Sequence, residues 1–332
     1  MTNGEFIIKL IRIAGSLSKI RISLSVTATT FTGYFVCTGS MSPSLLPLLA
    51  GIFLLSSGSA ALNHYQERKT DSLMERTKSR PIPSGLVSPG AVLYFTVIST
   101  ITGSLLLLSA FPPLILLLGL FNFLWYNAVY TPLKRITAFA VIPGSVTGGV
   151  PPLIGWLAGG GHWADPGIVV IVLFFIVGQI PHFWLLLLRY GREYEMAGLP
   201  SLTTLFSPVQ INRISYTWIV ATAAVSALLP AQGLISHPAL LLVYIAATAM
   251  LLMFSAYHNL SRNPESQHMS PFFALNIFYL LIMILLITDA AFTTQKHAVT
   301  AAAGCFFYYP YGKNTRRFPG ETNKFNNSYV YR

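Results

Sequence analysis

Charge is scarce in this sequence. Only 9% of its 332 residues are Asp, Glu, Lys or Arg, whereas 53% are hydrophobic, and the mean hydropathy is +0.60. A soluble domain carries about 25% charged residues, so this chain cannot cover a water-facing surface, and a soluble protein is excluded. Disorder over most of the chain is excluded as well, because disordered segments are poor in apolar residues.

Cysteine is almost absent. Cys37 and Cys305 are the only two, which excludes a disulfide scaffold and a cysteine-built zinc site, and we interpret both as inert. No apolar run with a small-residue cleavage site stands at the N-terminus, so we expect no signal peptide. The apolar runs are continuous rather than alternating, unlike the strands of a membrane β-barrel.

Long stretches without charge are where the chain can cross a bilayer. A charged side chain at mid-bilayer costs roughly 2.5–3.5 kcal/mol, and about 20 apolar residues span the hydrocarbon. The charge-free windows are residues 22–66, 81–133, 136–164, 166–188, 214–261 and 266–288, with breaks at Gly39–Pro43, Pro112–Pro113 and around Pro230–Pro238. They predict an all-α polytopic membrane protein, a bundle of about nine transmembrane helices over residues 22–291.

Basic residues follow alternate predicted helices, and the other connections contain none. The positive-inside rule places residues 1–21 and the basic loops in the cytoplasm, as expected for an inner (plasma) membrane protein. The net charge of +11 is explained by this topology and by anionic lipid, so no nucleic-acid partner is predicted. An odd number of spans puts the C-terminus outside the cytoplasm, yet the polar tail, residues 292–332, also carries basic residues. We expect this tail to be a flexible appendage.

Acidic residues gather near the end of the second predicted helix. Asn63, Glu67, Asp71 and Glu75 repeat every four residues, which places them on one helix face. Like charges at this spacing repel, and a bound hard cation would remove the conflict. Carboxylate and amide oxygens suit Mg²⁺, which also shares its coordination with phosphate oxygens. The pattern therefore favours a cytoplasm-facing site for a metal-bound phosphate compound.

Basic residues are interleaved with this acidic stripe. They are Arg68, Lys69, Arg76, Lys78 and Arg80. Carboxylates that hold Mg²⁺, together with Arg and Lys, would bind a diphosphate. A solvated loop with ordinary salt bridges explains the same residues equally well, so this segment alone leaves both interpretations open.

A second acidic cluster favours the diphosphate site. Arg192, Glu193 and Glu195 lie at the end of the sixth predicted helix, on the same side of the bundle as the stripe. Lys134 and Arg135 follow the fourth helix on that side. Two acidic clusters facing each other are what a pair of metal ions spanning one diphosphate requires.

At these positions the sequence resembles the UbiA-type intramembrane prenyltransferases. Residues 63–85, NHYQERKTDSLMERTKSRPIPSG, are similar to the family's N-x-x-x-D-x-x-x-D motif, and Arg80–Gly85 looks most like its heme-farnesylating branch. Further segments resemble the branch in the same order: Tyr130–Arg135, Pro151–Trp156, Pro181–Trp184, Arg192–Tyr194 and Ala197–Pro200. Glu67 and Glu193 stand where the family usually has Asp.

The resemblance implies transfer of a farnesyl group from farnesyl diphosphate to a vinyl group of heme b, giving heme O. Mg²⁺, or Mn²⁺ in its place, would be the cofactor, and heme A synthase or terminal oxidase assembly would supply partners. The predicted metal ligands are Asn63, Glu67, Asp71 and Glu193, which with Lys134 form the catalytic set. The predicted diphosphate-binding residues are Arg68, Arg76, Arg80, Lys134, Arg135 and Arg192.

Two further groups of residues could serve this reaction. An allylic cation is stabilised by aromatic faces, by about 0.5–2 kcal/mol per ring, and the candidates are Phe121, Phe123, Trp125, Tyr126 and Trp184. Ordinary bundle packing explains each ring as well. His182 and His64 are candidate heme ligands, with a hydrogen-bonded role inside the bundle as the alternative for both.

Other functions share parts of this pattern. The acceptor could be an aromatic quinone precursor or a chlorophyll-type ring, although the R-P-I-P and P-P-L-I-G-W segments favour heme. A small-molecule transporter is the rival outside the family, but it would place ionisable residues near mid-bilayer. Here they lie at helix ends, which favours chemistry on a diphosphate.

Overall fold

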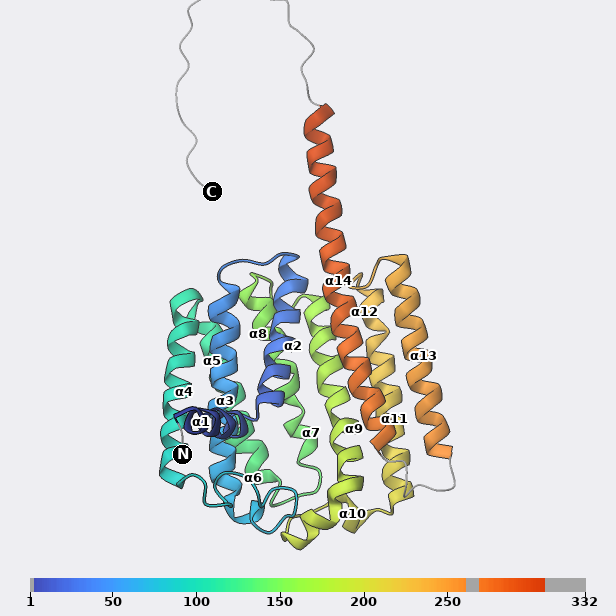
Figure 1. Cartoon of the computed structure of the whole chain (residues 1–332). Helices are drawn as coiled ribbons and strands as arrows, with labels where there is room; N and C mark the ends of the chain where they lie inside the picture. The colour runs from blue at the N-terminus through green and yellow to red at the C-terminus, as the bar shows by residue number, and fades with distance from the viewer. Residues whose placement is uncertain (1–2, 261–268, 308–332) are drawn as a thin grey trace, which may run out of the picture. The chain divides into compact units, whose positions relative to one another are not determined.

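The charge-free windows fold as long helices in the computed structural model, which describes residues 3–260 and 269–307. The larger helices are α1 Asn3–Leu17, α2 Ile20–Thr38, α3 Leu45–Asp71, α4 Pro89–Ala110, α5 Pro113–Leu124, α8 Val146–Ala158, α9 Pro166–Met196, α11 Pro208–Ser226, α13 Pro238–Leu260 and α14 Met269–Phe307 (Figure 1). The shorter elements are the π-helix η1 Trp125–Tyr130, α6 Thr131–Leu133, α7 Val141–Gly144, α10 Leu202–Leu205 and α12 Leu228–Ala231. No strand occurs in either described range.

Helix boundaries fall where the sequence predicts them. Gly39 ends α2 by adopting a positive φ of 64° and donating its N–H to Phe35 O, a conformation that costs glycine little. Pro113 and Pro238 each open a helix, where the missing N–H of proline needs no partner.

Eight helical segments of the described residues are long and apolar enough to span a bilayer. The first predicted span, α2, is a helix of 19 residues but is not among these eight, and its many Ser and Thr residues explain its lower hydropathy. The count is therefore close to the predicted nine, and the all-α fold class is confirmed. The chain is a multi-pass membrane protein.

Small residues let the central helices approach closely. α2 packs on α8, where a Cβ added to Gly155 would lie 1.9 Å from Thr30 O and one added to Gly33 would lie 2.0 Å from Pro152 O. The two backbones therefore touch, as is usual in membrane bundles where apolar lipid provides little drive for helix association.

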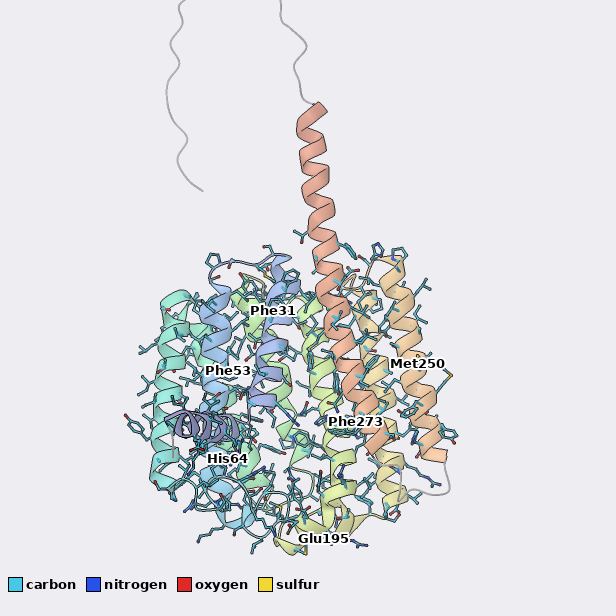
Figure 2. The ribbon with its side chains drawn as sticks, in the orientation of Figure 1. Phe31, Phe53, His64, Glu195, Met250 and Phe273 are labelled. Atoms are coloured by element: carbon cyan, nitrogen blue, oxygen red, sulfur yellow. The ribbon has the colours of Figure 1, made fainter. Side chains whose placement is uncertain are left out.

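Apolar side chains project outward from the bundle. Met250 on α13 projects from the edge of the bundle in Figure 2, and 67% of its surface is exposed. Phe273 on α14 is 56% exposed. In water such exposure would be costly, whereas acyl chains solvate it.

Two compact units divide the chain at residue 294. α14 continues past the predicted domain boundary at residue 291 and ends at Phe307. Residues 308–332 of the predicted tail lie outside the described residues, so the flexible appendage stays a prediction.

Candidate active site

The predicted acidic stripe occupies the last turns of α3. Asn63 and Asp71 are buried on this helix, and Glu67 lies between them. The helix ends at Asp71, so the expectation that Glu75 continues the stripe is wrong. Glu75 lies in the following turn, exposed, and forms an ion pair with Lys78 at 2.6 Å, as its i,i+3 spacing allows.

Asp71 pairs with Arg80 across the turn that follows α3. The Arg80 guanidinium donates to both carboxylate oxygens at 2.7 and 2.8 Å, and the Asp71 side chain is 1% exposed. Thr77 Oγ1 donates to Asp71 O at 2.9 Å. The R-P-I-P segment therefore folds back onto the acidic stripe, held by a charge-assisted pair.

Glu67 forms an ion pair with Lys134, the residue that follows α6. Both side chains are largely buried. Burial alone would lower the pKa of Lys134, but the neighbouring Glu67 carboxylate outweighs it and holds that pKa above its ordinary value. Lys134 therefore stays charged, with its ammonium also 5.0 Å from the Tyr130 ring centroid.

Asn63 connects three elements. Its amide oxygen accepts a hydrogen bond from Lys19 Nζ at 2.5 Å, and its amide nitrogen donates to Thr131 Oγ1 at 3.0 Å. Loss of hydration, aided by the positive charge of Arg80, lowers the pKa of Lys19 to about 7. Sequence reasoning used Lys19 only to assign topology and missed its place in the site.

The backbone at Lys19 is also unusual. Lys19 joins α1 to α2 with φ 44° and ψ 55°, the only positive φ of a non-glycine residue in the described chain. The left-handed region costs such a residue of the order of 1 kcal/mol or more. A basic side chain of the site is thus held by a strained linker between two helices.

One residue of the second acidic cluster contacts the turn that follows α3. Glu193, in the last turns of α9, accepts a hydrogen bond from the backbone N–H of Arg76 at 3.0 Å. The Arg76 guanidinium lies 4.8 Å from the Tyr190 ring centroid. Glu195 instead accepts from Thr203 Oγ1 at 2.5 Å and lies at the loop end of the bundle (Figure 2).

Three other predicted diphosphate ligands point elsewhere. Arg68 donates to Tyr65 O at 2.6 Å and stacks on the same residue's ring. Arg135 donates to Gln66 O at 2.6 Å, and Arg192 is exposed on α9. Arg68 and Arg135 thus contact backbone and aromatic groups rather than the carboxylates of the stripe.

The acids of the site are paired with bases rather than gathered around one point. Among the described residues, no three His, Cys, Asp or Glu side chains are placed together as a metal site would require. Each predicted ligand of α3 instead faces a cationic nitrogen: Asn63 that of Lys19, Glu67 that of Lys134, and Asp71 that of Arg80.

A π-helical turn brings two tyrosines to this site. η1 lies between α5 and α6. Pro132, in α6, has no N–H to donate to the preceding turn. Tyr126 and Tyr130 lie 5.5 Å apart by ring centroids, and Phe183 lies 6.0 Å from Tyr130. Such π-turns often occur at functional sites, and of the rings proposed from sequence Tyr126 is the one here.

The other candidate aromatics belong to packing. Phe121 and Trp125 contact each other at 5.4 Å, and Trp125 Nε1 donates to Pro143 O at 2.7 Å. Trp184 is buried against Trp218. Phe123 is half-buried on α5 and has no ring contact with the site residues above.

The two histidines lie in different surroundings. His64 is buried on α3, and its Nε2 lies 3.2 Å from Ser16 O, an arrangement that fits a hydrogen bond to α1. His182 on α9 packs against Phe272 of α14 at 4.7 Å. The contacts of His64 match the hydrogen-bonded alternative. His182 lies among aromatic rings and also has the Asn276 side chain of α14 as a hydrogen-bonding neighbour.

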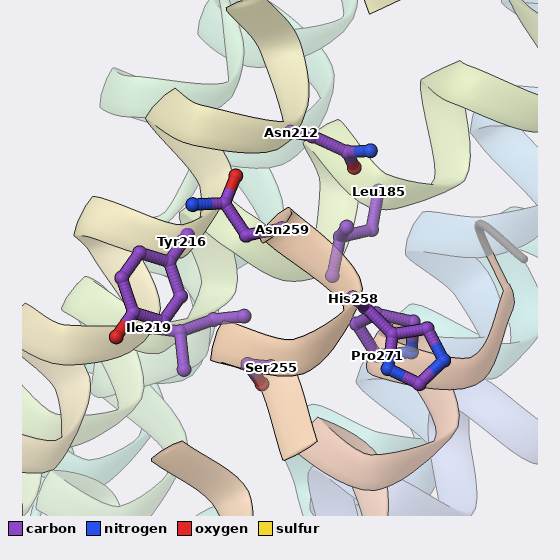
Figure 3. Close-up of a pocket in the computed structure, with 8 residues that line it drawn as sticks. All are labelled: Leu185, Asn212, Tyr216, Ile219, Ser255, His258, Asn259 and Pro271. Atoms are coloured by element: carbon purple, nitrogen blue, oxygen red, sulfur yellow. The ribbon is translucent and has the colours of Figure 1, made fainter. Parts of the chain in front are cut away.

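A small cavity away from the stripe is too small for a substrate. It is lined by α9, α11, α13 and α14, with polar groups from Asn212, Ser255 and Asn259 (Figure 3), and has a volume of about 10 Å³. That volume holds about one water molecule. The polar groups at the end of α3 remain the site with chemistry to offer.

Comparison with known proteins places the chain in a family. The model of the UbiA prenyltransferase family matches residues 26–277. Protoheme IX farnesyltransferase of Oleidesulfovibrio alaskensis is 32% identical over 285 residues, which is 86% of this chain and 99% of the relative. The enzyme of that name from Geobacter sulfurreducens is 38% identical over 237 residues, 71% of this chain and 87% of the relative.

Solved structures share the fold. A digeranylgeranylglyceryl phosphate synthase superposes with a TM-score of 0.69 at 15% identity, covering 85% of this chain and 98% of that one. A UbiA homolog from Archaeoglobus fulgidus bound to GPP and Mg²⁺ gives 0.64 at 14% identity, with 84% and 98% covered. The chain belongs to the UbiA prenyltransferase family, and it is a prenyltransferase.

Proposed function

We propose that this chain transfers a farnesyl group from farnesyl diphosphate to a vinyl group of heme b, giving heme O. Relatives named protoheme IX farnesyltransferase match it over up to 86% of its length, which favours heme over a quinone precursor or a chlorophyll-type ring. The observation that carries the proposal is the meeting of two acid–base segments, the end of α3 and the end of α9, through Glu193 and Arg76.

The donor atoms fit a hard divalent cation. Asn63, Glu67, Asp71 and Glu193 offer only carboxylate and amide oxygens, which suit Mg²⁺, and Mn²⁺ would accept the same set. When bound, the metal supplies positive charge to a diphosphate leaving group. The relative from Archaeoglobus fulgidus was solved with GPP and Mg²⁺, which supports a metal-bound prenyl diphosphate in this fold.

Lys134 and Arg80 supply the remaining positive charge. Both now neutralise carboxylates of the stripe. When a metal-bound diphosphate enters the site, the carboxylates can exchange their ion pairs for bonds to the metal. The two cations can then pair with phosphate oxygens. Lys19, beside Asn63, is a third basic group positioned to contact phosphate oxygens.

The reacting bond is that between farnesyl C1 and the diphosphate oxygen. The electron pair of this bond leaves with the diphosphate, and the cations of the site stabilise the developing negative charge. The vinyl π electrons of heme b then form the new bond to farnesyl C1, and water adds to the resulting cation and loses a proton, which gives the hydroxyl-bearing side chain of heme O. The rings of Tyr126 and Tyr130 lie beside those cations and would face the allylic carbocation. His182, in its aromatic surroundings on α9, is the proposed heme-side ligand.

The cellular setting follows from the same proposal. The distribution of basic loops favours, by the positive-inside rule, a cytoplasmic N-terminus and an active site at the cytoplasmic face of the inner membrane. Heme O leaves as a membrane-soluble product, so heme A synthase or a terminal oxidase stays the predicted receiving partner.

Chromatography of extracted pigment tests the reaction. Purified protein in lipid nanodiscs is incubated with heme b, farnesyl diphosphate and Mg²⁺. A new heme peak, more hydrophobic than heme b and heavier by a farnesyl-derived group, supports the proposal. Prenylation of an added aromatic acid or quinone precursor, with heme b unchanged, would contradict it.

A further inference from the structure

The N-terminal helix α1 lies across the bundle rather than along it. It is seen nearly end-on in Figure 1, where the spanning helices run up the page. Four apolar side chains of α1 are at least half exposed: Ile7, Ile8, Leu10 and Ile11. An apolar face on a helix that crosses the bundle is typical of a segment lying in the membrane interface.

The opposite face of α1 is polar and borders a cavity. Glu5, Lys9, Arg12 and Ser16 are spaced i, i+4, i+7 and i+11, so they share one face. All four line a cavity of about 520 Å³. Two cations and one acid among these four give this face a net positive charge.

The cavity's other wall is formed by residues 79–86, the segment whose Arg80 forms an ion pair with Asp71. Ser79, Pro81 and Leu86 line it, and Arg80, between the first two, is the residue that pairs with Asp71. Ile8, Ile13 and Leu86 supply an apolar part of the lining. The cavity thus combines cationic and apolar groups at the membrane surface, which is the chemistry that binds a charged amphiphile.

We propose that this cavity binds the headgroup of an anionic phospholipid of the surrounding bilayer. The headgroup phosphate would pair with Lys9 and Arg12, and the acyl chains would continue along the apolar face of α1. The volume of about 520 Å³ accommodates a lipid headgroup, and each surface cation near anionic lipid attracts it. The bound lipid would brace the segment that carries Arg80 against the acidic stripe.

Native mass spectrometry of the full chain tests this proposal. Protein released from bilayers that contain equal phosphatidylglycerol and phosphatidylcholine is expected to retain phosphatidylglycerol selectively. The double variant Lys9→Gln with Arg12→Gln should lose at least about tenfold of that occupancy. Arg21→Gln, which removes an exposed cation on α2 outside the cavity lining, is the matched control and should retain it.

Three results would overturn the proposal. The first is equal retention of phosphatidylglycerol and phosphatidylcholine, and the second is an equal loss of phosphatidylglycerol in the double variant and in the Arg21 control. The third is displacement of the lipid by inorganic pyrophosphate, which would make the cavity a substrate phosphate site. A photoactivatable phosphatidylglycerol gives an independent reading on the wild type. Crosslinks to α1 or to residues 79–86 support the proposal, and crosslinks confined to α13 contradict it. Neither readout depends on the prenyl transfer reaction.

Discussion

The carboxylate of Glu193 accepts the backbone N–H of Arg76 at 3.0 Å, although 117 residues separate the two in the chain. This hydrogen bond joins the end of α9 to the turn between Asp71 and Arg80. The two halves of the bundle therefore meet where the sequence places its acids.

Asp71→Asn should leave the protein inserted but reduce prenyl transfer by at least about 10²-fold. The amide keeps the shape of the side chain but removes the negative charge needed to hold a divalent cation. Turnover of farnesyl diphosphate in nanodiscs measures the effect. Glu75→Gln, in the exposed pair with Lys78, is the matched control, and wild-type turnover in the Asp71 variant would refute the assigned role.

Glu67 and Lys134 should show strong coupling in a double-mutant cycle. Removing one partner of a buried ion pair costs about 3–5 kcal/mol, because the other charge is left unpaired. Glu67→Gln and Lys134→Met should each destabilise the protein strongly, whereas the double variant should regain much of the loss. Denaturant unfolding in detergent measures stability, and additive losses would show that the two charges act independently.

The transmembrane helices and the acidic face of α3 show what local sequence pattern can predict. Charge-free windows locate spans because charge is costly in lipid, and four-residue spacing puts Asn63, Glu67 and Asp71 on one face because helices repeat at 3.6 residues. The end of α3 at Asp71 was not predictable in this way, since Glu75 fits the same spacing. Glu75 leaves the stripe because the chain turns after Asp71, and tertiary contacts determine that turn.

Lys19 and the η1 turn show the limit more clearly. Lys19 reaches Asn63 only because the linker between α1 and α2 adopts a left-handed conformation, for which Lys has no preference. Tyr126 was proposed together with four other aromatics, and nothing in their spacing separated it from Phe121 or Trp184. The π-turn and the packing of α9 make that distinction.

Asp289→Ala should lower stability without changing the reaction. Asp289 is buried on α14 and accepts N–H groups from Ser236 and His237 at 2.8 Å, just before α13 begins at Pro238. Loss of this acceptor leaves two backbone N–H groups without their partner, and an unsatisfied buried donor costs about 1–3 kcal/mol. The melting temperature should fall, while kcat of the folded fraction stays near the wild-type value; a large fall in kcat would connect this residue to the active site.

Gly155→Val should disrupt the contact between α2 and α8. A side chain there would meet Thr30 O at 1.9 Å from its first carbon, and overpacking of this kind costs about 1–3 kcal/mol or more. Gly90→Ala, where the added carbon meets nothing within 4 Å, is the control. Thermal unfolding should separate the two variants clearly, and equal melting temperatures would show that the helices can move apart at little cost.

Release of pyrophosphate with and without divalent metal tests the central claim most directly. Purified wild-type protein is supplied with heme b and farnesyl diphosphate, first with Mg²⁺ and then with excess EDTA. We predict pyrophosphate release and a farnesylated heme with Mg²⁺, loss of both in EDTA, and recovery when Mg²⁺ is restored. Undiminished turnover in EDTA would contradict the assignment of Asn63, Glu67, Asp71 and Glu193 as ligands of a metal-bound diphosphate.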